Sequence, residues 1–250
     1  MTPTLKTIAN FRDCGGAATL DGRHLRLGRV YRSGTLDDAR GADLRALRDL
    51  GLRTIIDLRA PREKKKTRPQ VDGARRVDIP IELETRTREK IEPLMTQRGA
   101  EPLVVSIMQQ TYRDLADEAW PQAGQLFKVL LNAEAYPVLI HCRAGKDRTG
   151  FMCALLQQAA GVKHEAIVQD YVETNRHFGR LTPRMVRLLK IFSLGRVQID
   201  NVRASLSACE EYLQAAFEQI EHGHGGLTAY LAKCGVTTRE LETLRDLLVE

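Results

Sequence analysis

Apolar and polar residues alternate with two different periods along the chain, and together these predict a mixed α/β protein. Short apolar runs bounded by turn residues predict buried strands at 29–33, 52–61, 74–81 and 136–142. The first of these completes a hairpin that starts near residue 10 and turns at "TLDG", residues 19–22. A helical pattern over 36–51, ending in a glycine, separates the hairpin from the next strand and favours parallel pairing.

Most of the remaining chain has the spacing of amphipathic helices. Helices are expected over residues 102–120, 122–134, 149–161, 164–178, 183–192, 202–222, 227–235 and 237–250. The fold class predicted from this order is α/β, with a small, mostly parallel central sheet flanked by many helices and an N-terminal hairpin. We expect a single domain over 1–250, in which 202–250 supply the C-terminal helices.

Two charged stretches have no fixed place in this pattern. Residues 82–107 are rich in helix formers and are broken at Pro93 and Gly99, so they form either a helical lid, an insertion or a plain solvated surface. The basic run "REKKKTR", residues 62–68, is a candidate patch for acidic lipid or phosphopeptide, although most such runs are solvated loops.

Composition narrows the class of protein. The chain has 250 residues, of which 43% are hydrophobic and 28% charged, without an apolar run of bilayer length. We expect a cytoplasmic protein with no integral membrane segment, with export lacking a signal as the alternative. The net charge of +6 suits an anionic substrate, whereas scattered charge and 5% aromatic residues disfavour nucleic acid. Five widely spaced cysteines disfavour a disulfide framework or a zinc finger.

The densest chemistry lies in "HCRAGKDRTG", residues 141–150, which joins a predicted strand to a predicted helix. Such a junction binds anions through its loop amides and the helix dipole. Cys142 opens the loop, where the same groups lower the pKa of a thiol. Arg148 follows six positions later and can bind two phosphate oxygens with its planar guanidinium. Gly145 lets the backbone turn, and the Thr149 hydroxyl can donate to the sulfur.

Two other interpretations of this loop are weaker. A nucleotide-binding loop of the G-x-x-x-x-G-K-[ST] type is absent, because Lys146 is followed by Asp147. A free cysteine is usually a small buried residue, yet the Cys-x5-Arg-Thr spacing on a strand–loop–helix frame favours a nucleophile. The sequence therefore predicts that Cys142 reacts with phosphorus.

The loop resembles the H-C-x5-R-[ST] signature of the cysteine-dependent protein tyrosine phosphatase superfamily. The segments "NFRDCGG", "RVYRSG", "GLRTIIDLRAPRE", "DYVETN" and "LTAYLAKCGVTTRELETLRDLL" resemble, in the same order, a bacterial branch that often also accepts phosphoserine or phosphoinositides. The resemblance implies a protein tyrosine phosphatase-like fold and hydrolysis of phosphomonoesters through a phosphocysteine, with no cofactor and no metal.

The resemblance also assigns residues to roles. Cys142 would be the nucleophile, Arg148 its partner on the phosphate, and His141 would fix the loop from behind. The residues expected to bind phosphate are Arg143, Ala144, Gly145, Lys146 and Thr149. Four positions resemble family positions near the loop, and buried ion pairs explain them equally well: Asn10, Arg12, Asp13 and Arg32.

The general acid is where the sequence departs from the better-known phosphatases. Those carry W-P-D before the cysteine, whereas residues 119–122 read "AWPQ". Asp147 inside the loop and Asp57 at the end of a neighbouring strand are equally strong candidates, since active sites of parallel sheets gather at the carboxyl ends of strands. The residue that is not the acid is expected to be a structural partner of Arg59 or of the loop.

The expected partner is a phosphorylated protein or a phosphoinositide, with inorganic phosphate or sulfate able to occupy the loop, and the protein is expected to be a monomer. Arg143 and Lys146 make the loop more basic than phosphotyrosine requires, as in phosphoinositide phosphatases; a solvated Lys146 is the alternative. The missing W-P-D acid leaves a second function open, a phosphoprotein- or phosphoinositide-binding module with weak or no turnover. A sulfur transferase is disfavoured by the spacing of Cys142 and Arg148.

Overall fold

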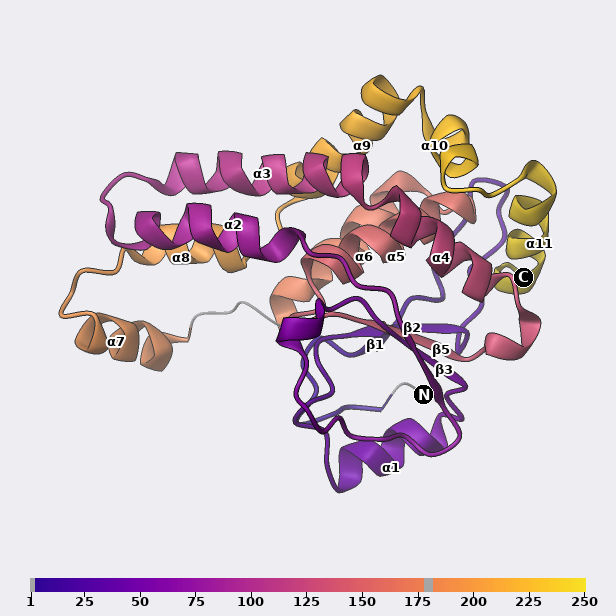
Figure 1. Ribbon diagram of the computed structural model, residues 1–250, viewed down its shortest axis with the longest axis horizontal. Helices are drawn as coiled ribbons and strands as arrows, with labels where there is room; N and C mark the ends of the chain where they lie inside the picture. Colours follow the sequence, from indigo (N-terminus) through magenta and orange to yellow (C-terminus); the bar gives the residue numbers. More distant parts are fainter. Residues whose placement is uncertain (1–2, 178–181) are drawn as a thin grey trace.

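A five-stranded sheet forms the centre of the protein (Figure 1). The computed structural model describes residues 3–177 and 182–250, apart from the side chains of residues 84 and 85. In sheet order the strands are β1 (Arg12–Asp13), β2 (Val30–Ser33), β5 (Val138–His141), β3 (Thr54–Asp57) and β4 (Arg75–Asp78). β1 pairs antiparallel with β2, and the other pairs are parallel. The predicted α/β class and mostly parallel sheet are therefore confirmed.

The two faces of the sheet belong to two different cores, because side chains alternate along each strand. Tyr31, Ile55 and Leu139 point to the face covered by α1 (Ala42–Asp49). Val30, Ile56, Val138 and Ile140 point to the opposite face and join the larger core with the helices. Both faces are covered, so the strands read as continuous apolar runs rather than as alternating ones.

The helices of the larger core form a thick layer on one side of the sheet (Figure 1). They are α3 (Glu101–Glu118), α4 (Trp120–Leu130), α5 (Asp147–Ala159), α6 (His164–His177), α9 (Glu210–His224), α10 (Leu227–Lys233) and α11 (Thr238–Leu248). α2 (Leu83–Ile91) and α8 (Ile199–Leu206) pack against α3, and α7 (Pro183–Phe192) lies at the far end of this arm. Short 3-10 turns occur at Pro61–Glu63 (η1), Glu92–Thr96 (η2) and Ala133–Ala135 (η3).

The N-terminal hairpin is confirmed, although its first strand is only two residues long. The turn closes where Thr19 N–H donates to Arg23 O at 2.9 Å, and Gly22 adopts a φ of 86°. Asp13 fastens the base of the hairpin by accepting from Gly15 N–H at 2.8 Å and from Gly28 N–H at 2.7 Å. Asp13 therefore holds the hairpin rather than the loop that contains Cys142.

The single helix predicted over 202–222 is wrong. α8 ends at Leu206 and α9 begins at Glu210. Between them the side chain of Asn175 donates to Ala208 O at 2.8 Å and accepts from Ala208 N–H at 2.7 Å. These two bonds satisfy the backbone groups that a continuous helix would have used, so a contact from α6 breaks a pattern that is helical by periodicity. Residue 178, the last of the helix predicted over 164–178, lies outside the described residues.

The 82–107 segment is helical, with the expected breaks. α2 gives way to η2, which carries Pro93 in its first turn, and Gly99 has a φ of 68° before α3 begins. Five of its apolar side chains are buried in the larger core, which excludes a merely solvated surface; these are Leu83, Ile91, Leu94, Ala100 and Val104. Its motion as a lid stays a prediction. Within the described residues, none of the helices combines the length and apolar character needed to cross a bilayer.

Candidate active site

The loop between β5 and α5 curls around the sulfur of Cys142. β5 ends at His141 and α5 begins at Asp147, so residues 142–146 turn the chain from the sheet into the helix. Gly145 N–H donates to Cys142 Sγ at 3.3 Å. Gly145 has a φ of 71°, and a Cβ at this position would lie 2.5 Å from the carbonyl carbon of Ser33. Only glycine fits this close approach between the loop and β2.

A buried ion network holds the loop from the side of β1 and β2. The carbonyl of Gly145 accepts from Asn10 Nδ2 at 2.8 Å and from Arg32 Nη2 at 2.9 Å. Asp170 on α6 then binds Arg32 at 2.7 Å and Arg12 at 2.8 Å. Burial raises the pKa of Asp170, but the two arginines outweigh it and keep the pKa below its ordinary value. The sequence placed Asn10, Arg12 and Arg32 near the loop; it did not single out Asp170, although "DYVETN" contains it.

The Cys142 thiol is only 2% exposed in this structure. Burial raises its pKa, and the Thr149 and Gly145 groups that face it lower the pKa without offsetting the burial. The lowered pKa predicted from the sequence is therefore wrong for this structure, because desolvation of the thiolate exceeds the stabilisation by the loop. The buried Thr149 hydroxyl faces the sulfur and is among the groups that lower the pKa of the thiol.

Arg148 is oriented by a carboxylate from η1 that the sequence analysis missed. Its Nη1 lies 2.6 Å from Glu63 Oε2, and its Nη2 lies 2.8 Å from Glu63 Oε1. The two side chains therefore form a bidentate ion pair. The guanidinium also donates to the carbonyls of Leu58 and Ile81, at 3.4 and 3.2 Å. Arg148 is 3% exposed, so these partners replace water around its charge. The sequence did offer one signal for this contact: Glu63 follows the end of β3 by only six residues, and strand ends in a parallel sheet lie near its active site.

The two candidate acids occupy different environments. Asp147 stands at the start of α5 with its side chain 33% exposed and accepts from the Tyr112 hydroxyl at 3.0 Å. Asp57 is fully buried and accepts from Arg59 Nε and Nη2, both at 2.9 Å. Burial raises the pKa of Asp57, yet Arg59 and His141 outweigh it and hold the pKa well below its ordinary value. This geometry favours Asp147 as the proton donor and Asp57 as the structural partner of Arg59.

His141 lies under the loop and is fully buried. Its Nδ1 lies 3.3 Å from Cys142 O, and its Nε2 lies 3.8 Å from Asp57 Oδ2. Burial lowers the pKa of His141 to about 4, so the ring is neutral at neutral pH. The ring thus lies behind the loop beside the carbonyl of Cys142, and its Nε2 has no hydrogen-bond partner within the described residues; its role in fixing the loop stays a prediction.

Lys146 is not solvated, which corrects one of the two alternatives for this residue. It is 2% exposed, and its Nζ donates to Ser205 O at 2.6 Å and to Ser207 O at 3.3 Å. The loop lysine thus fastens the end of α8 to the site. Arg143 remains exposed with its carbonyl accepting from Thr35 N–H at 2.9 Å, and Ala144 beside it is half-buried.

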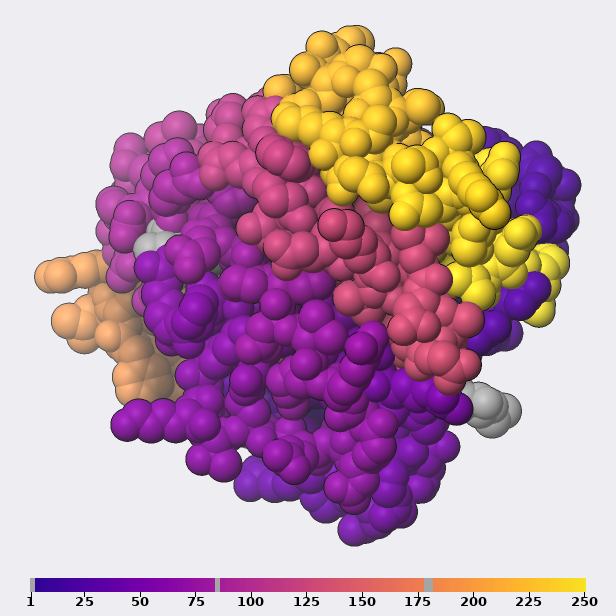
Figure 2. Space-filling view, turned by 45° about the vertical axis from the view of Figure 1, so that its right-hand side comes forward, coloured from indigo at the N-terminus to yellow at the C-terminus, as the bar shows by residue number. Residues whose placement is uncertain are grey.

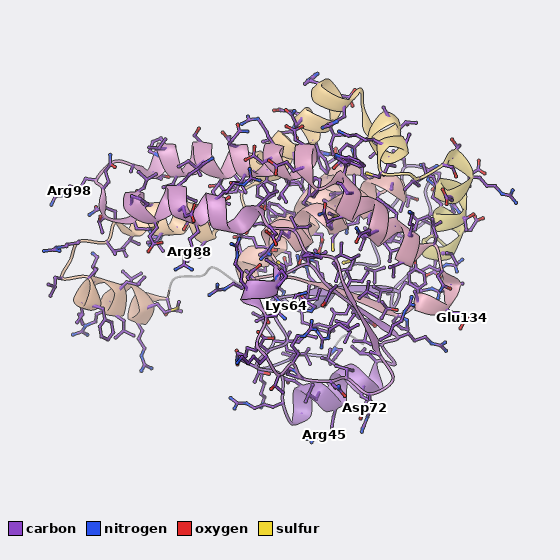
Figure 3. All side chains as sticks on the ribbon, viewed as in Figure 1. Arg45, Lys64, Asp72, Arg88, Arg98 and Glu134 are labelled. Atoms are coloured by element: carbon purple, nitrogen blue, oxygen red, sulfur yellow. The ribbon has the colours of Figure 1, made fainter. Side chains whose placement is uncertain are left out.

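Three of the five cations in the basic run at 62–68 are paired with aspartates. Lys64 lies 3.1 Å from Asp78, and Lys65 lies 2.9 Å from Asp38. Arg68 also binds Asp78, at 2.9 Å. Figure 3 places Lys64 beside η1, between the sheet and the arm formed by α2 and α8. These pairs weaken the candidate patch for an acidic ligand.

Residues 119–122 form no loop over the site. Trp120 and Pro121 begin α4, and Gln122 continues it. No acid therefore stands at the position that W-P-D occupies in the better-known phosphatases, and the helix fixes that segment in the core.

The comparisons with known proteins agree with this geometry. A family model described as "Tyrosine phosphatase family" matches residues 3–250. The chain is 32% identical to a protein of Cupriavidus necator named as a tyrosine-protein phosphatase, over 90% of this chain and 81% of that protein. It is 30% identical to the "triple specificity protein phosphatase PtpB" of Mycobacterium tuberculosis, over 96% of both chains. A tyrosine-protein phosphatase of Nostoc commune is 26% identical over 86% of this chain and 72% of its own length.

Proposed function

The chain belongs to the tyrosine phosphatase family, and from that premise we propose that it hydrolyses phosphotyrosine, phosphoserine and phosphothreonine in proteins, and phosphoinositides, with Cys142 as the nucleophile. The observation that carries this proposal is the position of Cys142 Sγ inside the loop at the start of α5, 3.3 Å from Gly145 N–H. A phosphoryl group seated there meets inward-pointing amides, the positive end of a helix and a guanidinium.

In the proposed first step, the Cys142 thiol loses its proton to solvent, the resulting thiolate attacks phosphorus, and the bond between phosphorus and the leaving oxygen breaks. Arg148 and the loop amides hold the three equatorial oxygens, and Asp147 gives its proton to the leaving oxygen. In the second step, water attacks the phosphocysteine while Asp147 takes a proton from that water. The Thr149 hydroxyl donates to the sulfur as it leaves, which restores the thiolate.

The position of the acid supports a broad specificity. Asp147 belongs to the same loop as the nucleophile, so its distance from the phosphorus does not depend on a separate loop that closes around one kind of substrate. Its side chain is 33% exposed and lies 3.3 Å from Lys146 Nζ, so alcohols of different size can approach it from solvent. The relative named a triple specificity phosphatase is consistent with such a site.

The test is hydrolysis of phosphomonoesters in EDTA by the wild type, Cys142→Ser, Asp147→Asn and Asp57→Asn. Cys142→Ser is expected to have no measurable turnover while still binding phosphate analogues. Asp147→Asn is expected to lose about 10²–10⁴ in kcat on phosphoserine peptides, and much less on an aryl phosphate with a good leaving group, since only the poor leaving group needs the proton.

Asp57→Asn separates the acid from its rival. It is expected to unfold more easily while keeping the wild-type ratio of kcat on the two substrate types. A selective loss on phosphoserine peptides in Asp57→Asn, with Asp147→Asn unaffected, would assign the acid to Asp57 instead. A wild type that binds phosphate analogues but turns over none of several phosphomonoesters would support the binding-module alternative.

A further inference from the structure

Helix α7 presents its apolar face to solvent. Met185, Leu188 and Phe192 follow one another at helical spacing and are 46%, 41% and 83% exposed. Ile191 and Leu194 add exposures of 57% and 82%. Eight large apolar side chains are exposed in the described part of the chain, and five of them lie between 185 and 194. The rest of the surface does not gather apolar side chains in this way, so the concentration on α7 requires an explanation.

The protein covers only part of α7, and Val186 and Leu189 are half-buried. The groove between α7 and α8 is lined by Pro183, Val186, Arg187, Lys190, Ile191 and Arg203. This groove takes Arg187 and Lys190 from α7 together with three apolar residues, but not Met185, Leu188 or Phe192, and no residue of α7 is buried. Figure 2 shows the segment protruding from the body, and Figure 3 shows its side chains extending into open space. The apolar face is left without a partner within the described residues.

The charge of the segment favours one kind of partner. Arg184, Arg187, Lys190 and Arg196 lie between residues 182 and 198, where the sequence has no aspartate or glutamate. A helix with leucine, methionine and phenylalanine on one face and only cations among its charges is typical of segments that lie in the interface of an anionic bilayer. Lipid headgroups neutralise the cations while the apolar face enters the acyl boundary.

The chain turns sharply at the end of this helix. Leu194 adopts a φ of 52°, a left-handed conformation that glycine usually takes, and Gly195 follows with a φ of 75°. The leucine is 82% exposed there, so its side chain gains nothing from the protein interior. A bulky apolar residue in a turn position adds to the exposed face of Phe192 and extends it past the helix end.

We propose that α7, with the turn that contains Leu194, docks the protein on membranes that carry anionic lipids. The basic side chains Arg184, Arg187 and Lys190 contact the headgroups, and Leu188, Phe192 and Leu194 enter the bilayer interface. A short connection leads from this segment to α8, whose far end is fastened to the catalytic loop by Lys146. A docked α7 therefore tethers the loop to the membrane surface. Docking itself requires no assumption about the substrate.

The test is sedimentation of the full chain with vesicles of phosphatidylcholine, alone or mixed with phosphatidylserine. The wild type is expected to bind the mixed vesicles and to leave them as salt is added, because the cations contribute to binding. Leu188→Gln/Phe192→Gln is expected to weaken binding at least about tenfold, and Arg184→Gln/Lys190→Gln about tenfold. The matched control is Leu20→Gln/Leu27→Gln, which removes two exposed leucines outside α7 and is expected to bind like the wild type.

Three outcomes would overturn the proposal. A wild type that does not sediment with the mixed vesicles excludes membrane docking, whatever its phosphatase activity. Equal binding by the α7 variants and the control assigns the membrane contact to another surface. A wild type that is dimeric in light scattering, and becomes monomeric in Leu188→Gln/Phe192→Gln without any vesicle binding, assigns the face to a second copy of the chain. Turnover of a soluble aryl phosphate, measured in parallel, confirms that each variant is folded.

Discussion

The catalytic loop and helix α7 place their side chains in opposite ways, and both ways are unusual. Around the loop, charged groups are buried: Arg32, Asp57 and Arg59 are at most 1% exposed. In α7, large apolar groups are exposed, and Phe192 reaches 83%. Burying charge and exposing apolar surface both cost free energy.

The two regions differ in which interactions offset this free-energy cost. Buried charges near the loop meet opposite charges within the fold, as Asp170 on α6 does with Arg12 and Arg32. The apolar face of α7 meets no such partner within the described residues, so its compensation must come from outside the chain. The fold thus stabilises the catalytic loop internally and leaves α7 for an external surface.

The largest expected effect comes from breaking the ion network behind the loop. Asp170→Asn leaves Arg12 and Arg32 without their counter-charge in a buried site, which is expected to lower the free energy of unfolding by about 3–5 kcal/mol. Urea unfolding measures this loss. The control is Asp21→Asn, which breaks the exposed pair of Asp21 with Arg23 and is expected to unfold like the wild type. Equal losses of unfolding free energy in Asp170→Asn and Asp21→Asn would contradict the argument that a buried ion pair stabilises more than an exposed one.

A smaller effect is expected from the pH dependence of His141. The unfolded ring titrates near 6.5, whereas burial lowers the folded pKa to about 4. Above both values the ring is neutral in both states. As the pH falls through 6.5, only the unfolded state gains the proton, so stability decreases until the folded ring titrates near 4. The full difference corresponds to about 3 kcal/mol.

The measurement is urea unfolding at about pH 7 and about pH 4.5 for the wild type and for His141→Gln. Other groups also titrate in this range, so the difference between the two proteins isolates the histidine. His141→Gln is expected to lose less stability on acidification than the wild type. If both proteins lose the same amount, the ring is accessible to protons in the folded state.

The smallest expected effect is on stability in α7. Phe192→Gln removes a side chain that is 83% exposed, so the free energy of unfolding is expected to change by less than about 0.5 kcal/mol. The matched variant Phe127→Ala, in the core on α4, is expected to cost about 3–5 kcal/mol. Thermal unfolding of both variants checks the contrast. A large loss in Phe192→Gln would mean that α7 packs on the protein in solution.

Some features of the site were visible in the sequence and others were not. The loop, its strand and its helix could be predicted from a local pattern, because Cys142, Gly145 and Arg148 lie close together in the sequence. Glu63 was not predicted, since it lies 85 positions from Arg148 and reaches it only through the neighbouring strand end. Tyr112 on α3, which donates to Asp147, was missed for the same reason.

By itself, the sequence determined most of the elements and the reactive loop, because periodicity and turn residues act over a few positions. It also left Asp57 and Asp147 as equal candidates for the acid, since both are carboxylates near a strand end. Only the tertiary structure distinguished them, by burying Asp57 against Arg59 and leaving Asp147 partly exposed. It likewise raised the pKa of Cys142 and turned the apolar face of α7 outward. Burial, pairing and orientation depend on which distant segments meet, and no local pattern encodes them.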